Sequence, residues 1–149
     1  MRDRRSEAIA VPGIGCRLPG GADSADDYWN LLCQGRDTSG PAPAERWRDY
    51  ADRGPSYAAA VRRTLSRGHF LGDVAGFDAE FFGLSPREAE LMDPQQRLVM
   101  ETAWEALEHA GIPAGALAGT DTGVYVGVCT GDYGHRLLED LPDIEAWTG

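Results

Sequence analysis

The sequence predicts a layered α/β protein, and three observations lead to that prediction. Residues 93–111 have the pattern of one long amphipathic helix. Residues 123–128 have the composition of a strand covered on both faces, and residues 8–11 form a shorter apolar run. A long amphipathic helix that precedes a buried strand is typical of helices packed in layers against a sheet. At 149 residues the chain is long enough to form one domain.

The first element predicted is a short buried strand at residues 8–11, Ala-Ile-Ala-Val, because turn-forming residues follow this apolar run. Within that turn, Gly13-Ile-Gly15 has the spacing that opens a dinucleotide-binding fingerprint. The third glycine position holds Leu18, however, and Pro19 would interrupt the helix that should receive the pyrophosphate. The sequence therefore does not support a nucleotide site.

A short helix is predicted next, over about residues 25–34. Ser24 can accept hydrogen bonds from the free N–H groups of its first turn, and Gly35 suits its end. From residue 37 to about 68 the pattern weakens. We expect mostly surface loop there, with a helical turn or two at residues 58–63.

An aromatic cluster precedes the long helix. So many rings in a short stretch require a core larger than one helix can provide. The apolar members are Phe70, Leu71, Val74, Phe77, Phe81, Phe82 and Leu84. Ser85 and Glu88 then flank a proline in the order typical of a helix start, so a short helix is predicted to run from there to Met92.

The long helix has a well-defined start and end. Asp93 can cap its first turn, Pro94 suits the first helical position, and Gln96 is the expected capping-box partner. Gly111 and the proline two residues later end it. One side is apolar and is expected to be covered by other elements. That side carries Val99, Met100, Ala103, Trp104, Ala106, Leu107 and Ala110.

The last predicted strand, Gly123-Val-Tyr-Val-Gly-Val128, is bulky and uncharged. A short helical pattern follows at residues 135–138, and residues 139–149 carry no closing element. The seven residues at the other end, 1–7, are interpreted as a solvated linker end rather than a signal peptide.

Composition excludes several classes of function. The formal net charge is −10, from 24 acidic and 14 basic residues, which would repel nucleic acid and an anionic membrane face. No apolar run approaches the ~18 residues of a membrane span. Cys16, Cys33 and Cys129 are odd in number and lack the spacing of a disulfide framework or a zinc site. A reducing compartment, the cytoplasm, fits best.

The most suggestive chemical motif is Gly127-Val-Cys-Thr-Gly131, because a cysteine in a tight turn after a strand resembles an exposed nucleophile. Such a nucleophile needs a base, and His135 is the one histidine downstream, with no acid placed to orient it. We favour a packed Cys129 at the end of a strand.

The remaining candidates have structural interpretations. His109 lies in the last helical turn and His69 in a glycine turn, without ligand-spaced partners. Asp93 is interpreted as a cap rather than a general acid, and Glu101 and Glu105 as a solvated helix face. Residue chemistry alone therefore predicts no catalytic, cofactor-binding or metal-binding residue in this chain.

Five stretches nevertheless resemble the N-terminal part of the ketosynthase domain of type I polyketide synthases. They are IAVPGIGCRLPGG at 9–21, FDAEFFGLSPREA at 77–89, MDPQQRL at 92–98, WEALE at 104–108 and TGVYVG at 122–127. The resemblance spans residues 8–149. It implies part of a thiolase-like fold, in which two similar α/β halves pack in five layers, usually as homodimers. It also implies an acyl chain transferred from the phosphopantetheine of an acyl carrier protein to a cysteine and condensed with a decarboxylated malonyl-type unit.

Two departures from the family pattern matter. The family's nucleophile lies in a later motif resembling Asp-Thr-Ala-Cys-Ser-Ser, with two histidines and a lysine further on, and residues 8–149 are predicted to stop before all of them. Cys129 is not at the family's nucleophile position. Pro12 stands where the family usually has a β-branched residue, which predicts a shortened first strand.

Two functions remain open from the sequence. The first is an inactive part of an acyl-condensing ketosynthase. The second is a non-catalytic piece that docks on a complementary ketosynthase half or a partner subunit, which predicts a large exposed apolar surface.

Overall fold

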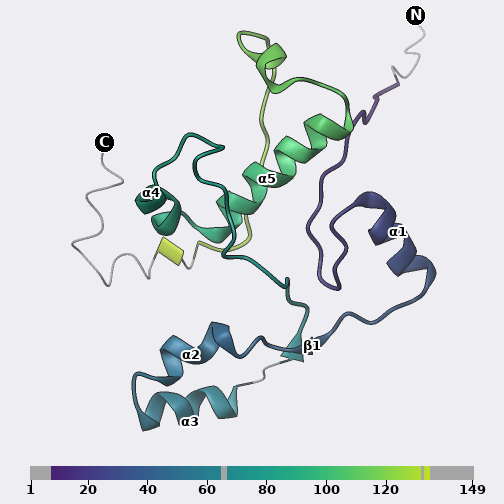
Figure 1. Ribbon diagram of the computed structural model, residues 1–149. Coiled ribbons are helices and arrows are strands. Elements are labelled where there is room, and N and C mark those ends of the chain that lie inside the picture. Colours follow the sequence, from purple (N-terminus) through teal and green to yellow (C-terminus); the bar gives the residue numbers. More distant parts are fainter. Residues whose placement is uncertain (1–7, 65–66, 132, 135–149) are drawn as a thin grey trace, which may run out of the picture. The chain divides into compact units, whose positions relative to one another are not determined.

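The computed structural model describes residues 8–64, 67–131 and 133–134 (Figure 1). Its contacts divide the chain into two compact units. One unit joins residues 1–15 to residues 75–149, and the other comprises residues 16–74. The segment 8–15 therefore packs with sequence that lies far from it along the chain.

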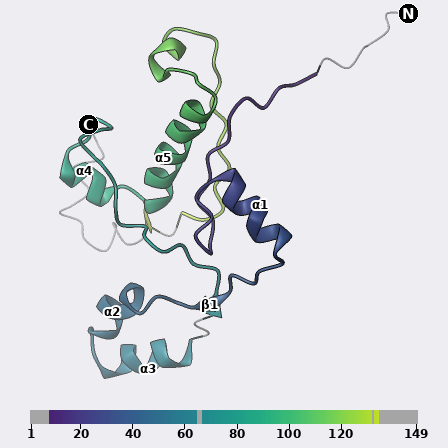
Figure 2. The ribbon, with the colours of Figure 1, turned by 45° about the vertical axis from the view of Figure 1, so that its right-hand side comes forward.

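In the unit of residues 16–74, the described residues form three helices and one small sheet. The helices are α1 (Ala25–Cys33), α2 (Glu45–Ala51) and α3 (Pro55–Arg63). Strands β1 (Gly40–Pro41) and β2 (Arg67–Gly68) pair antiparallel, with Gly40 opposite Gly68. In Figures 1 and 2, α2 and α3 lie side by side as a helical hairpin.

Helix α1 confirms its predicted cap, because the Ser24 hydroxyl accepts a hydrogen bond from the Asp27 N–H at 3.1 Å. The expectation of mostly surface loop over residues 37–68 is wrong, since α2 and α3 form there. The helical turns predicted at residues 58–63 are confirmed as part of α3. Both helices are short, and their stability comes from packing on each other. The rings of Tyr50 and Tyr57 meet edge to face across the hairpin, with centroids 5.0 Å apart.

The other unit is built on α4 (Pro86–Leu91), α5 (Pro94–His109) and the short 3₁₀ helix η1 (Ala114–Leu117). The predicted start of α4 is confirmed as a complete capping box between Ser85 and Glu88. Asp93 caps helix α5 as predicted. Its carboxylate accepts a hydrogen bond from the Gln95 N–H at 2.9 Å. The expected side-chain partner, Gln96, is therefore wrong, and the partner is its neighbour Gln95.

Four rings of this unit pack together at the side of α5. Phe77 stacks on Phe82 with centroids 5.1 Å apart, and Phe81 meets Phe82 edge to face at 5.0 Å. Phe81 also meets Trp104 of α5 edge to face at 4.8 Å. The second half of the predicted aromatic cluster thus packs on the long helix.

The two predicted strands at residues 8–11 and 123–128 do not form. Both segments lack a ladder partner among the described residues, and their side chains face solvent. Ile9 is 92% exposed and Val11 76%, while Val124 is 84% exposed and Tyr125 96%. Their apolar composition indicates burial, but a strand also needs neighbours for its N–H and C=O groups, and the described part of the chain offers none.

The buried core of the described residues is correspondingly small. It consists of Ala22, Ala89 and Leu91. The apolar side of α5 is only partly covered, with Val99 exposed and Trp104, Ala106 and Leu107 half-buried.

Candidate functional site

The glycine pair of the Gly-x-Gly motif is a contact surface for α5. A Cβ atom at Gly13 would overlap the carbonyl oxygen of Ala106, and one at Gly15 would overlap that of Thr102. The backbone of residues 13–15 therefore lies so close to the helix that residues with a side chain would not fit at positions 13 and 15. This contact accounts for both glycines.

His109 completes this contact. Its Nδ1 atom accepts a hydrogen bond from the N–H of Ile14 at 3.0 Å. The lone pair of this ring nitrogen is therefore what binds the backbone of the segment. His109 holds the segment 8–15 on the last turn of α5, which is a structural role as predicted.

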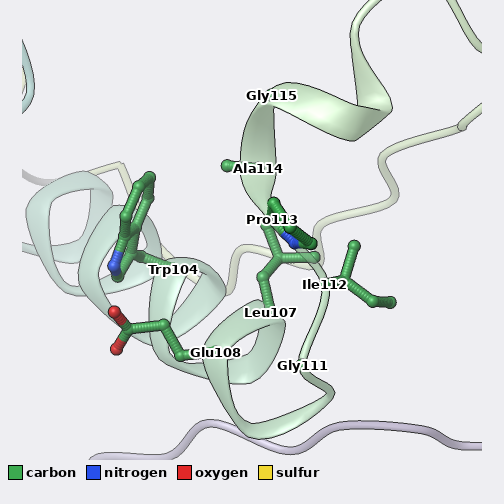
Figure 3. Close-up of a pocket in the computed structure, with 8 residues that line it drawn as sticks. All are labelled: Trp104, Leu107, Glu108, Gly111, Ile112, Pro113, Ala114 and Gly115. Carbon is green, nitrogen blue, oxygen red and sulfur yellow. The ribbon is translucent and has the colours of Figure 1, made fainter.

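An apolar hollow lies where α5 turns into η1 (Figure 3). Its volume is about 540 Å³. In Figure 3 the methyl group of Ala114 points toward the ring of Trp104, and the carboxylate of Glu108 lies on the Trp104 side of the hollow. The lining residues are Trp104, Leu107, Glu108, Gly111, Ile112, Pro113, Ala114 and Gly115.

The hollow has the character of a packing surface rather than a reaction site. Glu108 is the one ionisable group in its lining, and no nucleophile stands beside it. The helical pattern places Trp104 and Leu107 on the apolar side of α5, but it does not predict the hollow, because the hollow depends on how Pro113 redirects the chain after Gly111.

The corner between α4 and α5 holds the segment that carries Cys129. The Gln95 side-chain amide donates through Nε2 to the Thr130 carbonyl oxygen at 3.2 Å. The Tyr133 hydroxyl donates to the Glu90 carbonyl oxygen at 2.9 Å. These contacts join residues 35 and 43 positions apart in sequence. The capping pattern in the sequence predicts roles for Asp93 and Gln96 at this corner but none for Gln95.

Cys129 itself is exposed, so the expectation of a packed cysteine is wrong. The strand against which it was expected to pack does not form. Its proposed base, His135, lies outside the described residues.

The other histidine candidate, His69, belongs to a polar network beside strands β1 and β2. Its Nδ1 atom lies 2.8 Å from the Thr38 hydroxyl. Next to it the Arg67 guanidinium donates to the Ser39 hydroxyl at 3.0 Å. Hydrogen bonds from the Ser39 N–H and hydroxyl lower the pKa of Asp37 below its ordinary value. These hydrogen bonds join residues 38–39, just before β1, to residues 67–69, in and just after β2.

The acidic candidates on α5 do not converge on a metal. Glu101 and Glu105 are half-buried rather than fully solvated. Within the described ranges, no group of three or more His, Cys, Asp or Glu side chains could hold a metal ion. None of the helices in these ranges is long and apolar enough to cross a bilayer.

Comparison with known proteins identifies the family. Residues 6–148 match the family model described as the N-terminal domain of β-ketoacyl synthase. The chain belongs to the β-ketoacyl synthase family. The resemblance carried by the five sequence stretches is therefore confirmed.

Similar proteins include two much longer synthases from different organisms. The chain is 52% identical over 141 residues to a 6-methylsalicylic acid synthase of Arthrobotrys oligospora, covering 95% of this chain and 8% of that protein. It is 48% identical over 147 residues to a phenolphthiocerol/phthiocerol polyketide synthase chain of Mycobacterium tuberculosis, covering 99% of this chain and again 8% of the relative. The chain thus spans about a twelfth of the length of these relatives.

A solved ketosynthase shows the same partial coverage. The oxazolomycin ketosynthase domain of Streptomyces albus superposes with a TM-score of 0.71 at 35% identity, covering 89% of this chain and 23% of that one. The fold is therefore part of a thiolase-like α/β ketosynthase. The exposed segments 8–11 and 123–128 belong to a scaffold of which this sequence represents less than a quarter.

Proposed function

We propose that residues 8–149 form the N-terminal portion of a type I polyketide synthase ketosynthase, with residues 1–7 as a linker end. The complete domain catalyses a decarboxylative carbon–carbon condensation. In that reaction a carrier-bound acyl thioester passes to a cysteine, and a malonyl-type unit loses CO₂. The resulting carbanion attacks the acyl thioester, forms the new bond and releases the cysteine thiolate.

The observation that carries the proposal is the match over residues 6–148 together with the exposed apolar segments at 8–11 and 123–128. No Asp-Thr-Ala-Cys-Ser-Ser motif occurs in the sequence, so the nucleophile and its histidine partners must come from other residues. The chain alone is then inactive, with no catalytic, cofactor-binding or metal-binding residue of its own. Its partners in the complete protein are an acyl carrier protein, through its phosphopantetheine arm, and a second ketosynthase. Three unpaired cysteines favour the cytoplasm as its location.

An acyl-loading assay tests this proposal. The 149-residue chain, incubated with a radiolabelled acyl thioester, should take up no label. The full-length ketosynthase protein that carries these residues should be labelled, and Cys129→Ala should not change its labelling. Acyl transfer by the chain alone that Cys129→Ala abolishes would refute the proposal and favour a nucleophile at Cys129.

The second candidate is a non-catalytic piece that docks on a complementary ketosynthase half. The exposure of Ile9, Val11, Val124 and Tyr125 favours it, because exposed extended segments are available for strand addition. Mixing the chain with the remaining ketosynthase sequence should give a stable complex with suppressed binding of an apolar dye. A dye-silent, monodisperse monomer of the chain would contradict this candidate.

A further inference from the structure

Gln95 makes two side-chain hydrogen bonds that link the start of α5 to a distant segment. Its Nε2 donates to the Asp93 carboxylate at 3.2 Å and to the Thr130 carbonyl oxygen at 3.2 Å. An amide nitrogen has two hydrogens, so these two acceptors use both. In the reversed amide orientation the Gln95 oxygen would face a carboxylate and a carbonyl, neither of which can donate. The chemistry of the partners therefore fixes the orientation of the Gln95 side chain.

Asp93 orients Gln95 while it caps the helix. One of its carboxylate oxygens accepts from the Gln95 N–H at 2.9 Å, and the other accepts from the Gln95 side chain. Capping the helix requires one acceptor, which a serine or asparagine could also provide. The second carboxylate oxygen is what aims the Gln95 amide at Thr130.

A second hydrogen bond holds the same segment a few residues on. The Tyr133 hydroxyl donates to the carbonyl oxygen of Glu90, in the last turn of α4. Two hydrogen bonds thus hold residues 129–131 at the α4–α5 corner. One comes from the Gln95 side chain of α5, and the other from the Tyr133 side chain, which lies just after this segment. Gly127 and Gly131 give this stretch little stiffness of its own, so its position depends on such contacts.

The segment 129–131 follows the carboxyl end of the apolar stretch 123–128. In open α/β sheets, ligands bind in the crevice beyond the carboxyl ends of the strands. We propose that Asp93 and Gln95 are positioning residues that hold the 129–131 segment at the substrate side of the ketosynthase. This inference rests on the proposed function, in which residues 123–128 become a strand of the completed sheet.

The experiment uses the full-length ketosynthase protein and compares Gln95→Leu with Gln96→Leu. Both glutamines are exposed and lie in the first turn of α5, but only Gln95 reaches Thr130. The acyl donor is an N-acetylcysteamine thioester, which represents the end of a phosphopantetheine arm. Steady-state loading gives KM and kcat, and hydrogen exchange reports on the amides of residues 129–131.

Gln95→Leu should raise KM for the thioester between about twofold and tenfold, the range expected for one lost hydrogen bond, with kcat within about twofold of native. The amides of 129–131 should exchange faster, whereas Gln96→Leu should match the native protein in both readouts. Asp93→Asn keeps the cap but presents an NH₂ group to the Gln95 amide. It should therefore raise KM in the same direction even if Gln95→Leu fails to fold.

Equal KM and equal exchange for Gln95→Leu and Gln96→Leu would overturn the inference. So would unchanged KM in Asp93→Asn. A native full-length protein that loads no acyl group would instead refute the proposed function itself, so the two failures are distinguishable.

Discussion

Helix α5 and the segment 123–128 belong to the same unit and were predicted with equal clarity, yet only the helix forms. The helix pairs its N–H and C=O groups within itself and needs only its caps, which Asp93 and the turn at Gly111 supply. The segment 123–128 has the composition of a strand, but its hydrogen-bond partners must come from other strands. A capped helix can therefore form in part of a scaffold, whereas the segment 123–128 needs strands from the rest of it.

The close approach of residues 13–15 to α5 shares a feature with each of these two segments. Like a strand, it depends on residues far away in sequence, but like the helix it forms without a sheet. Gly13→Ala should break it with the largest effect, since the new Cβ would overlap the Ala106 carbonyl oxygen. We expect a loss of about 3 kcal/mol in the free energy of unfolding of the complete ketosynthase domain, measured by chemical denaturation. Gly72→Ala, where a Cβ meets open space, is the control and should cost less than about 1 kcal/mol. Equal losses would contradict the close approach.

The ring contact between Trp104 and Phe81 tests whether α5 is held by its neighbours or only by itself. Trp104→Ala should lower the free energy of unfolding by about 2 kcal/mol, less than the roughly 3–5 kcal/mol of fully buried rings, because Trp104 is half-buried. A double-mutant cycle with Phe81→Ala should give a coupling of about 0.5–1.5 kcal/mol. Strictly additive effects would show that the two rings do not interact.

The cap of α5 tests whether local hydrogen bonds stabilise this helix. Asp93→Ala removes the acceptor for the Gln95 N–H and should lower the free energy of unfolding by about 1 kcal/mol. Asp93→Ser retains a capping oxygen and should recover most of that loss. A stability for Asp93→Ala equal to native would mean that α5 does not depend on this cap.

The smallest expected effect concerns Glu88 and pH. Hydrogen bonds from the Ser85 hydroxyl and N–H lower the pKa of Glu88, so the folded state favours the charged carboxylate. Its contribution is complete above the unfolded-state pKa of about 4.5 and is lost as the pH falls through the lower folded-state pKa. Glu88→Gln keeps the capping box without a titrating group. The native protein should therefore lose slightly more stability than Glu88→Gln between about pH 5 and pH 3, and parallel pH profiles would contradict this.

Sequence predicted best what is encoded within a few residues. The caps at Ser24, Ser85 and Asp93 were found because a capping side chain and its N–H donors lie within one turn. Of the α2–α3 hairpin, the sequence indicates only the helical turns at residues 58–63, because helices of 7 and 9 residues show little periodicity and depend on each other.

The candidate site was less predictable. The family followed from motifs, but the contact of Gln95 with Thr130 joins residues 35 positions apart, and nothing in the DPQQR stretch indicates which glutamine makes it. The sequence shows no nucleotide role for the Gly13–Gly15 pair, but its contact with the carbonyl groups of α5 is visible only in the structure.

The most direct test of the account is hydrogen exchange at the amides of residues 124–128, measured in the 149-residue chain and in the full-length ketosynthase protein. The account predicts exchange near the unprotected rate in the chain alone, because these amides lack ladder partners there, and strong protection in the full-length protein. Strong protection of residues 124–128 in the chain alone would show that it completes its own sheet and would contradict the account.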